Sequence, residues 1–160
     1  MTRQVPGQII NYMLWSLAGV LLLTGCNVLP PLPVVDITGG DWTVRQGQAV
    51  WKPAQKAPEL AGEVLLATRE PGRVFVQFTK TPFPLLVAQT AGNCWEASIP
   101  ARNQRFSGRG RPPARLLWLY LPKALAGESL PRGFSWERHG DTWRLENTAR
   151  GEFIEGFFAP

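Results

Sequence analysis

Beyond residue 40, short apolar runs alternate with turn residues along the chain. Apolar and polar side chains also alternate within runs such as Val74-Phe75-Val76-Gln77-Phe78, which places Val74, Val76 and Phe78 on one face of a strand. Runs of this kind, separated by Pro, Gly, Asn and Asp, are typical of antiparallel strands that follow one another. The pattern predicts strands at 42–46, 49–51, 63–69, 74–79, 85–90, 94–99, 134–138, 142–147 and 152–158.

Turn residues join these predicted strands into hairpins. Glu70-Pro71-Gly72-Arg73 has proline and glycine at the central turn positions. Gly47 is expected to break the first strand in two. Alternation predicts further inward-facing side chains in two strand pairs: Trp95, Ala97 and Ile99 in one, and Phe134, Trp136, Trp143 and Leu145 in the other.

The segment 114–121 is apolar nearly all round, and we predict a helix there. It follows Pro112-Pro113, which a first helical turn tolerates, and Pro122 ends or restarts it. A helix without a polar face must lie across or inside a curved sheet. A buried strand is the alternative, because a short apolar run does not separate the two by its period. With 15 prolines and 16 glycines for turns, the pattern indicates a β-rich fold.

The N-terminus has the order of an export signal. Arg3 precedes an uncharged apolar run at 9–23, and about fifteen residues are too few for the roughly twenty of a membrane span. The run ends in Leu23-Thr24-Gly25-Cys26, which resembles the lipobox of bacterial lipoproteins. We therefore expect residues 1–25 to be a cleaved signal peptide and Cys26 to carry the lipid. A plain secretory signal or a short membrane anchor is the alternative.

The residue after the lipobox bears on location. In the lipoproteins that this signal resembles, an aspartate after the cysteine retains the protein in the inner membrane, and here Asn27 follows. The resemblance implies a lipid-anchored protein of the outer membrane that faces the periplasm. Residues 26–40, with Pro30, Pro31 and Pro33, are expected to form a tether that holds the domain away from the bilayer.

The remaining length suits one domain at residues 41–160. Cys94 is the only cysteine besides Cys26, so no disulfide is expected once Cys26 is lipidated. The net charge is +5, and the stretch 97–127 has no acidic residue. We expect its cations to contact anionic lipid headgroups or an acidic partner in the envelope, namely Arg102, Arg105, Arg109 and Arg111. A solvated loop is the alternative, and an exported chain is not expected to bind nucleic acid.

The sequence has no arrangement of residues that predicts catalysis. His139 is the only histidine and lies beside Gly140 in a predicted turn. Glu152 and Glu155 are three apart, which on a strand places them on opposite faces and prevents a carboxylate pair. We therefore expect a protein that is not an enzyme and that uses no metal or cofactor.

Several stretches of the predicted domain resemble the LolA/LolB superfamily of lipoprotein carriers and acceptors, and within it the lipid-anchored LolB branch. They are Gly62-Glu63-Val64-Leu65-Leu66, 73–78, 82–88, 143–147 and 151–156. The resemblance implies an incomplete antiparallel β-barrel, lined with apolar side chains and covered by one or two helices. Such a half-barrel holds the acyl chains of a lipoprotein in transit.

We therefore expect an outer-membrane lipoprotein that binds a lipid or an acylated ligand and takes part in lipid or lipoprotein transfer. The tryptophans could equally be filled core, and the alternative function is a non-catalytic accessory subunit of an envelope assembly. The residues expected to line the ligand cavity are Val74, Val76, Phe78, Trp95, Trp118, Trp136 and Trp143.

Overall fold

A computed structural model describes residues 29–160 of the chain. The predicted signal peptide, Cys26 as the predicted site of lipid attachment, and Asn27 lie outside the described residues. Residues 31–160 form one compact unit. Within the described part of the chain, no helix has both the length and the hydropathy that crossing a bilayer requires.

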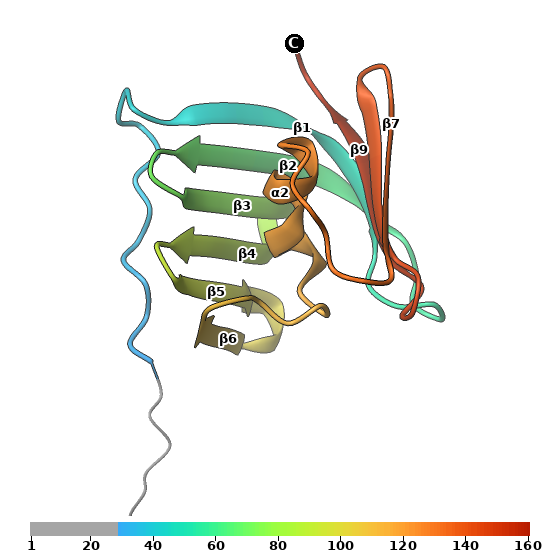
Figure 1. Ribbon diagram of the computed structural model, residues 1–160, viewed down its shortest axis with the longest axis horizontal. Coiled ribbons are helices and arrows are strands. Elements are labelled where there is room, and N and C mark those ends of the chain that lie inside the picture. The colour runs from blue at the N-terminus through green and yellow to red at the C-terminus, as the bar shows by residue number, and fades with distance from the viewer. Residues whose placement is uncertain (1–28) are drawn as a thin grey trace, which may run out of the picture. The chain divides into compact units, whose positions relative to one another are not determined.

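The described residues fold around one antiparallel sheet (Figure 1). The order across the sheet is β6-β5-β4-β3-β2-β1-β9-β8-β7, so consecutive strands pair from β1 to β6 while β9 returns to the free side of β1. β6 and β7 remain as unpaired edges, and the sheet is not closed. Its strands are β1 (Thr43–Lys52), β2 (Leu60–Arg69), β3 (Arg73–Lys80), β4 (Phe83–Ala91), β5 (Cys94–Ile99), β6 (Gln104–Arg109), β7 (Phe134–His139), β8 (Thr142–Asn147) and β9 (Glu152–Phe158).

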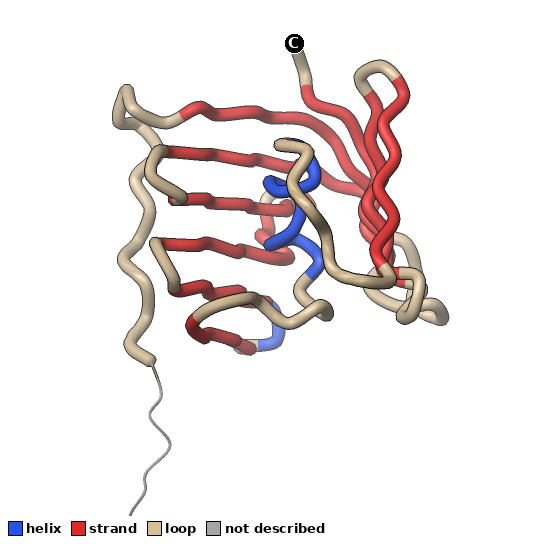
Figure 2. The backbone as a smooth tube through the Cα atoms, in the orientation of Figure 1, coloured by secondary structure: helices blue, strands red, loops and turns tan. Residues whose placement is uncertain are grey.

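Short helical turns from the connection between β6 and β7 cover the sheet (Figure 2). The 3-10 helix η2 (Leu117–Tyr120) continues into α2 (Leu121–Leu125) and contacts β4, β8 and β9. A second 3-10 turn, η1 (Pro100–Arg102), joins β5 to β6. The expected fold class, a mainly β incomplete barrel with covering helices, is confirmed.

The faces predicted from alternation are also confirmed. Val76 and Phe78 are fully buried, and Trp95, Ala97, Trp143 and Leu145 are buried on the same side of the sheet. At the centre, the ring of Trp118 stacks on Phe78 with 5.0 Å between centroids. The middle of the half-barrel is therefore filled by protein side chains.

Gly47 bends β1 and does not break it, so the expected division of this strand was wrong. Gly47 pairs with Phe158 of β9, and a Cβ at Gly47 would lie 1.9 Å from the carbonyl oxygen of Phe157. A Cβ at Gly156 would lie 2.2 Å from the carbonyl oxygen of Gln48. Only glycine permits this close approach of β1 and β9 where the sheet curls.

The predicted helix at 114–121 was partly wrong. Leu116 has φ −103° and ψ 66°, which is not helical, and helical backbone begins only at Leu117. Pro122 lies in the first turn of α2, where its missing N–H group costs nothing. Proline thus restarts the helix, and Leu117–Tyr120 place all four side chains in the core.

The arginine-rich stretch expected to be a loop contains the edge strand β6. Its backbone pairs with β5, and alternation turns Phe106 toward the core while Arg105 and Arg109 lie on the opposite face. An edge strand with arginines on its outer face has the same composition as a solvated loop, and this composition led to the prediction of a loop.

The predicted tether lies partly against the domain. The Leu32 N–H donates to Oε2 of Glu96 in β5 at 3.0 Å, and Leu32, Val35 and Ile37 are half-buried. The segment has no helix or strand between residues 29 and 38. The described part of the predicted tether therefore contacts the domain, and its role as a spacer stays a prediction.

Candidate ligand-binding cavity

A cavity of about 380 Å³ lies at one end of the core face, beside the filled centre. This volume falls at the lower end of the range for small-molecule sites, roughly 300–1,000 Å³. Most of its wall is apolar. The apolar lining consists of Trp51, Pro53, Leu60, Leu85, Leu86, Ala97, Ile99, Ala101, Phe106, Leu116 and Trp118.

A register shift in β4 helps to form this wall. Phe78 pairs with Leu86 but Thr79 pairs with Pro84, which leaves Leu85 as the extra residue of a bulge. As a result, two consecutive leucines line the cavity instead of facing opposite sides. Ala97, which pairs with Ala88 of β4, is small and also lines the cavity.

Glu152 is the buried acid of the cavity wall, with only 4% of its surface exposed. The indole N–H of Trp51 donates to its Oε1 at 3.4 Å, and Nε of Arg150 lies 3.7 Å from its Oε2, too far for a hydrogen bond. Oε2 makes no hydrogen bond to any described residue. Burial raises the pKa of Glu152 to about 7, although the Trp51 hydrogen bond and the Arg150 charge act in the opposite direction.

A second orphan polar atom belongs to Trp118. Its Nε1 is buried and has no hydrogen-bond acceptor among the described residues. Trp51 lies next to it, with 5.9 Å between ring centroids, and Trp51 also contacts Glu152. The residues of the cavity wall therefore include two buried polar atoms without a hydrogen-bond partner among the described residues, and neither atom is exposed to the cavity.

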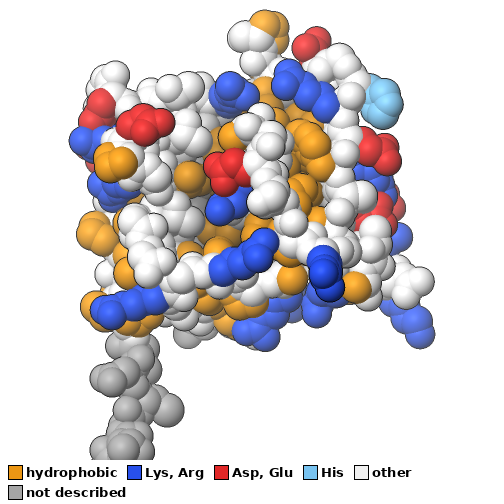
Figure 3. All heavy atoms as spheres, in the orientation of Figure 1, with side chains coloured by type: hydrophobic (Ala, Val, Ile, Leu, Met, Phe, Trp, Pro, Cys, Tyr) orange, Lys and Arg blue, Asp and Glu red, His pale blue; other side chains and the backbone are white. Residues whose placement is uncertain are grey.

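Three arginines complete the lining: Arg102, Arg115 and Arg150. The guanidinium of Arg115 is held over the ring of Phe106, 5.2 Å from its centre. Figure 3 shows several Lys and Arg side chains across the lower part of the drawn face, in the region where Figure 1 draws β5 and β6. Positive charge thus accompanies the apolar opening.

The structure separates the four arginines that were expected to act together. Arg102 lines the cavity, whereas Arg105 pairs with Glu96 at 2.9 Å on the other face of the sheet. Arg109 is exposed at the end of β6, and Arg111 lines a different, polar hollow of about 1070 Å³. Of the four, only Arg102 is placed to meet a ligand in the cavity.

The residues predicted to line the cavity are likewise divided. Trp118 is in the cavity wall, and Val76 and Phe78 are filled core. Val74 and Trp95 line the polar hollow at the other end of the strands. In the β7–β8 hairpin, Trp136 stacks on Trp143 with 6.4 Å between centroids.

Trp51 and Glu152 line the cavity but were not among the residues predicted to do so. Trp51 alternates with Ala49 and Glu152 with Ile154, so the same alternation rule assigns both to the core face. The prediction placed Glu152 and Glu155 on opposite faces of the strand but did not assign Glu152 to the core face, where burying a carboxyl is costly.

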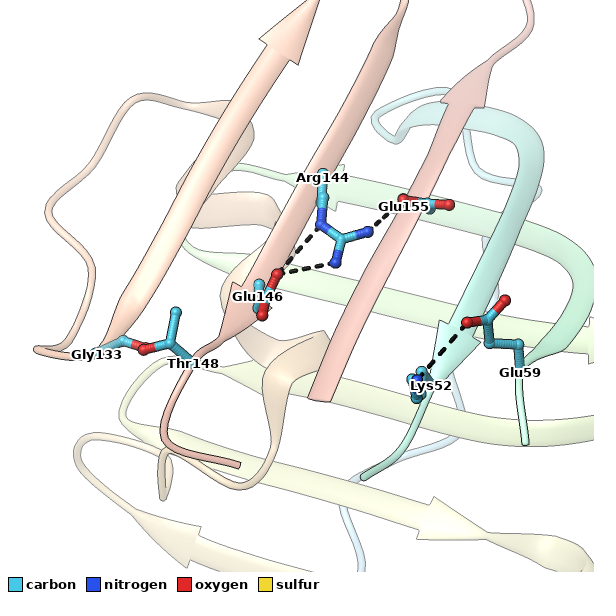
Figure 4. A network of polar contacts seen from close by, with 7 residues as sticks. All are labelled: Lys52, Glu59, Gly133, Arg144, Glu146, Thr148 and Glu155. Carbon is cyan, nitrogen blue, oxygen red and sulfur yellow. Dashed lines mark hydrogen bonds and ion pairs between the residues drawn. The ribbon is translucent and has the colours of Figure 1, made fainter. Parts of the chain in front are cut away.

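The opposite face of β8 and β9 carries an ion-pair network instead of a second acid in the cavity (Figure 4). Arg144 contacts Glu146 at 2.9 Å and Glu155 at 2.5 Å. Glu155 lies in an open groove of about 720 Å³, away from Glu152. The prediction that Glu152 and Glu155 do not form a carboxylate pair is confirmed.

Comparison with protein-family models and with curated proteins finds no match to this chain. The resemblance to the LolA/LolB superfamily therefore remains a proposal.

Proposed function

We propose that this protein is a lipid-anchored envelope protein whose half-barrel binds one apolar chain of a lipid or acylated ligand. The observation that carries the proposal is the cavity of about 380 Å³ with aromatic and aliphatic walls. Burial of a chain there contributes about 0.8 kcal/mol per methylene, so binding needs few polar contacts. The lipobox at Cys26 supports membrane attachment, and a role in lipid or lipoprotein transfer follows from the resemblance.

The size of the cavity limits the ligand. With Trp118, Phe78 and Trp51 packed together at the centre, no space remains there for several long chains. If each water-sized group of the ligand occupies about 30 Å³, the cavity has room for about a dozen such groups. We therefore propose a single chain, or the end of one, as the ligand.

The test is native mass spectrometry of residues 27–160, expressed without the lipid anchor and purified without denaturation. We expect lipid in a defined ratio to the protein. Ala101→Trp should abolish it, because Ala101 is exposed in η1 and a large ring there fills the cavity. Ala126→Trp is the matched control, since Ala126 is also exposed but lines the polar hollow. A lipid-free wild-type protein that is fully folded contradicts the proposal.

A second candidate function is a non-catalytic accessory subunit of an envelope assembly. The filled centre favours it, because the core gains its stability without any ligand. Pull-down of the same envelope protein by wild type and by Ala101→Trp would support this function over lipid binding.

The anchor is tested separately. We expect Cys26→Ala to leave the precursor unprocessed and unlipidated, and globomycin to have the same effect on the wild type. Unchanged processing and membrane association under both conditions would remove the lipoprotein assignment while leaving the cavity intact.

A further inference from the structure

Three arginines of the cavity wall come from separate parts of the chain. Arg102 lies in η1, Arg115 precedes η2, and Arg150 lies in the turn between β8 and β9. All three residues are exposed, so their charges are open to a ligand that enters the cavity from solvent. Positive charge from three elements thus meets at one apolar cavity.

Two of these arginines are held against the wall. The guanidinium of Arg115 lies over the ring of Phe106, 5.2 Å from its centre. Nε of Arg150 lies 3.7 Å from Oε2 of Glu152. Phe106 and Glu152 themselves line the cavity. Because both guanidinium groups already have a contact with the wall, less side-chain entropy is lost when they meet an anion.

Acids of the protein do not balance these charges. Among the described residues, Glu152 is the one acid of the cavity wall, and it is buried. Arg102 and Arg115 form no ion pair with any residue from 29 to 160. Two cations of the wall therefore remain available to a negative charge from outside the chain.

The two larger hollows lack this excess of positive charge. The polar hollow has nearly as many acids as cations, and Asp41 and Glu128 pair there with Arg69 and Lys123. The open groove has more acids than cations. Unpaired cations beside a mostly apolar wall thus distinguish the cavity of about 380 Å³.

We infer that the cavity binds a single-chain amphiphile with an anionic oxygen head group, a carboxylate or a phosphate ester. The chain lies against the apolar wall, and the head group stays at the solvent side with Arg102, Arg115 and Arg150. The inference rests on the proposed function, because it assigns the head group of the ligand that the same cavity would hold.

The chain and the head group have different parts in binding. Removal of the chain from water supplies most of the affinity. Each exposed ion pair adds little, because water and salt screen it, but several arginines around one head group act together. Arginine also donates paired hydrogen bonds to carboxylate and phosphate oxygens. The head group therefore decides between ligands of equal chain length.

The test compares decanoate, decanamide and undecylammonium, which have the same number of heavy atoms but differ in charge. Each is titrated calorimetrically, below the concentration at which it forms micelles, into lipid-free residues 27–160, which contain the compact unit 31–160. At about pH 8 and low salt, decanoate should bind about tenfold more tightly than decanamide, and undecylammonium should bind most weakly. At about 1 M salt the preference for decanoate should fall to about twofold.

Variants assign the preference to the arginines. Arg102→Gln and Arg115→Gln should each lower the ratio of decanoate to decanamide affinity about two- to threefold, and the double variant should lower it to about twofold or less. Both leave the contact between Arg150 and Glu152 in place. Arg109→Gln is the matched control and should keep the wild-type ratio, because Arg109 is exposed on β6 but does not line the cavity.

The outcomes separate the inference from the proposed function. Equal affinities for the three probes, or a preference for decanoate that the double variant retains, would overturn the inference while leaving chain binding intact. Displacement of decanoate by an equal concentration of inorganic phosphate would also overturn it, because the site would then take free anions. Failure of all three probes to bind would overturn chain binding in this cavity and the inference with it.

Discussion

At the centre of the core face, Trp118 stacks on Phe78 and Trp51 meets both rings edge-on. Further along β4 and β5, the same kinds of apolar side chain surround a hollow of about 380 Å³ that contains a buried acid. The difference lies in what crosses the sheet. η2 inserts its rings at the centre, whereas Arg115 and Leu116 just before it line the hollow without filling it. Only the second region has room for a ligand.

The largest expected effect is on the filled centre. Trp118→Ala removes a fully buried ring and should lower the free energy of unfolding by about 3–5 kcal/mol, measured by urea denaturation. Trp136→Ala is the control, because Trp136 is only half-buried and should cost clearly less. Equal losses for the two variants would mean that the centre is no better packed than the hairpin.

The buried acid of the cavity should make stability depend on pH. The pKa of Glu152 is about 7 in the folded protein against an ordinary 4.5, so the folded state holds the proton more tightly. Stability should therefore fall as the pH rises from about 4.5 to about 7, by up to about 3 kcal/mol, and then level off.

Glu152→Gln tests this directly. The variant should lack that decline and be more stable than wild type above the Glu152 pKa, as measured by thermal and urea unfolding across the pH range. If wild type and variant follow parallel curves, the carboxyl is better solvated than the cavity geometry indicates.

A smaller effect is expected at the curl of the sheet, which holds the two regions in place. Gly156→Ala puts a Cβ 2.2 Å from the carbonyl oxygen of Gln48 and should cost about 2 kcal/mol of unfolding free energy. Gly40→Ala is the matched control, because a Cβ at Gly40 meets nothing within 4 Å. If Gly156→Ala left the unfolding free energy unchanged, β1 and β9 would have to separate easily.

The smallest effects should distinguish the arginines of the two faces. Arg105→Gln leaves the largely buried Glu96 without its ion pair and should cost about 1 kcal/mol. Arg102→Gln should change the unfolding free energy by less than about 0.5 kcal/mol, because Arg102 is exposed at the cavity. Urea denaturation at low and high salt measures the loss of unfolding free energy in each variant. A larger loss for Arg102→Gln than for Arg105→Gln would contradict the assignment of the two arginines to opposite faces.

Much of the strand pattern could be predicted from the sequence, because alternation reports directly which side of a strand is buried. Val76, Phe78 and Leu145 were assigned to the core in this way. β6 could not be predicted in this way, because an edge strand rich in arginine has the same composition as a loop. Gly47 was read as a break because its role depends on the approach of β9, a strand about a hundred residues away.

The candidate site was predicted less well. Trp118 was assigned to the lining, but Trp51 and Glu152 were not. The bulge at Leu85, which turns two leucines to one side, has no signal in the alternating pattern. Ala97 also lines the cavity, and its place beside Ala88 of β4 follows only from the pairing of β4 and β5.

By itself, the sequence determined which residues face the core and that the chain forms a β-rich sheet with a short covering segment. The tertiary structure decided where that core is solid and where it is hollow. The physical reason is that periodicity records burial one strand at a time. Whether the core is filled depends on how tightly the sheet curls at Gly47 and Gly156 and on where the rings of η2 pack. Both depend on contacts between distant parts of the chain.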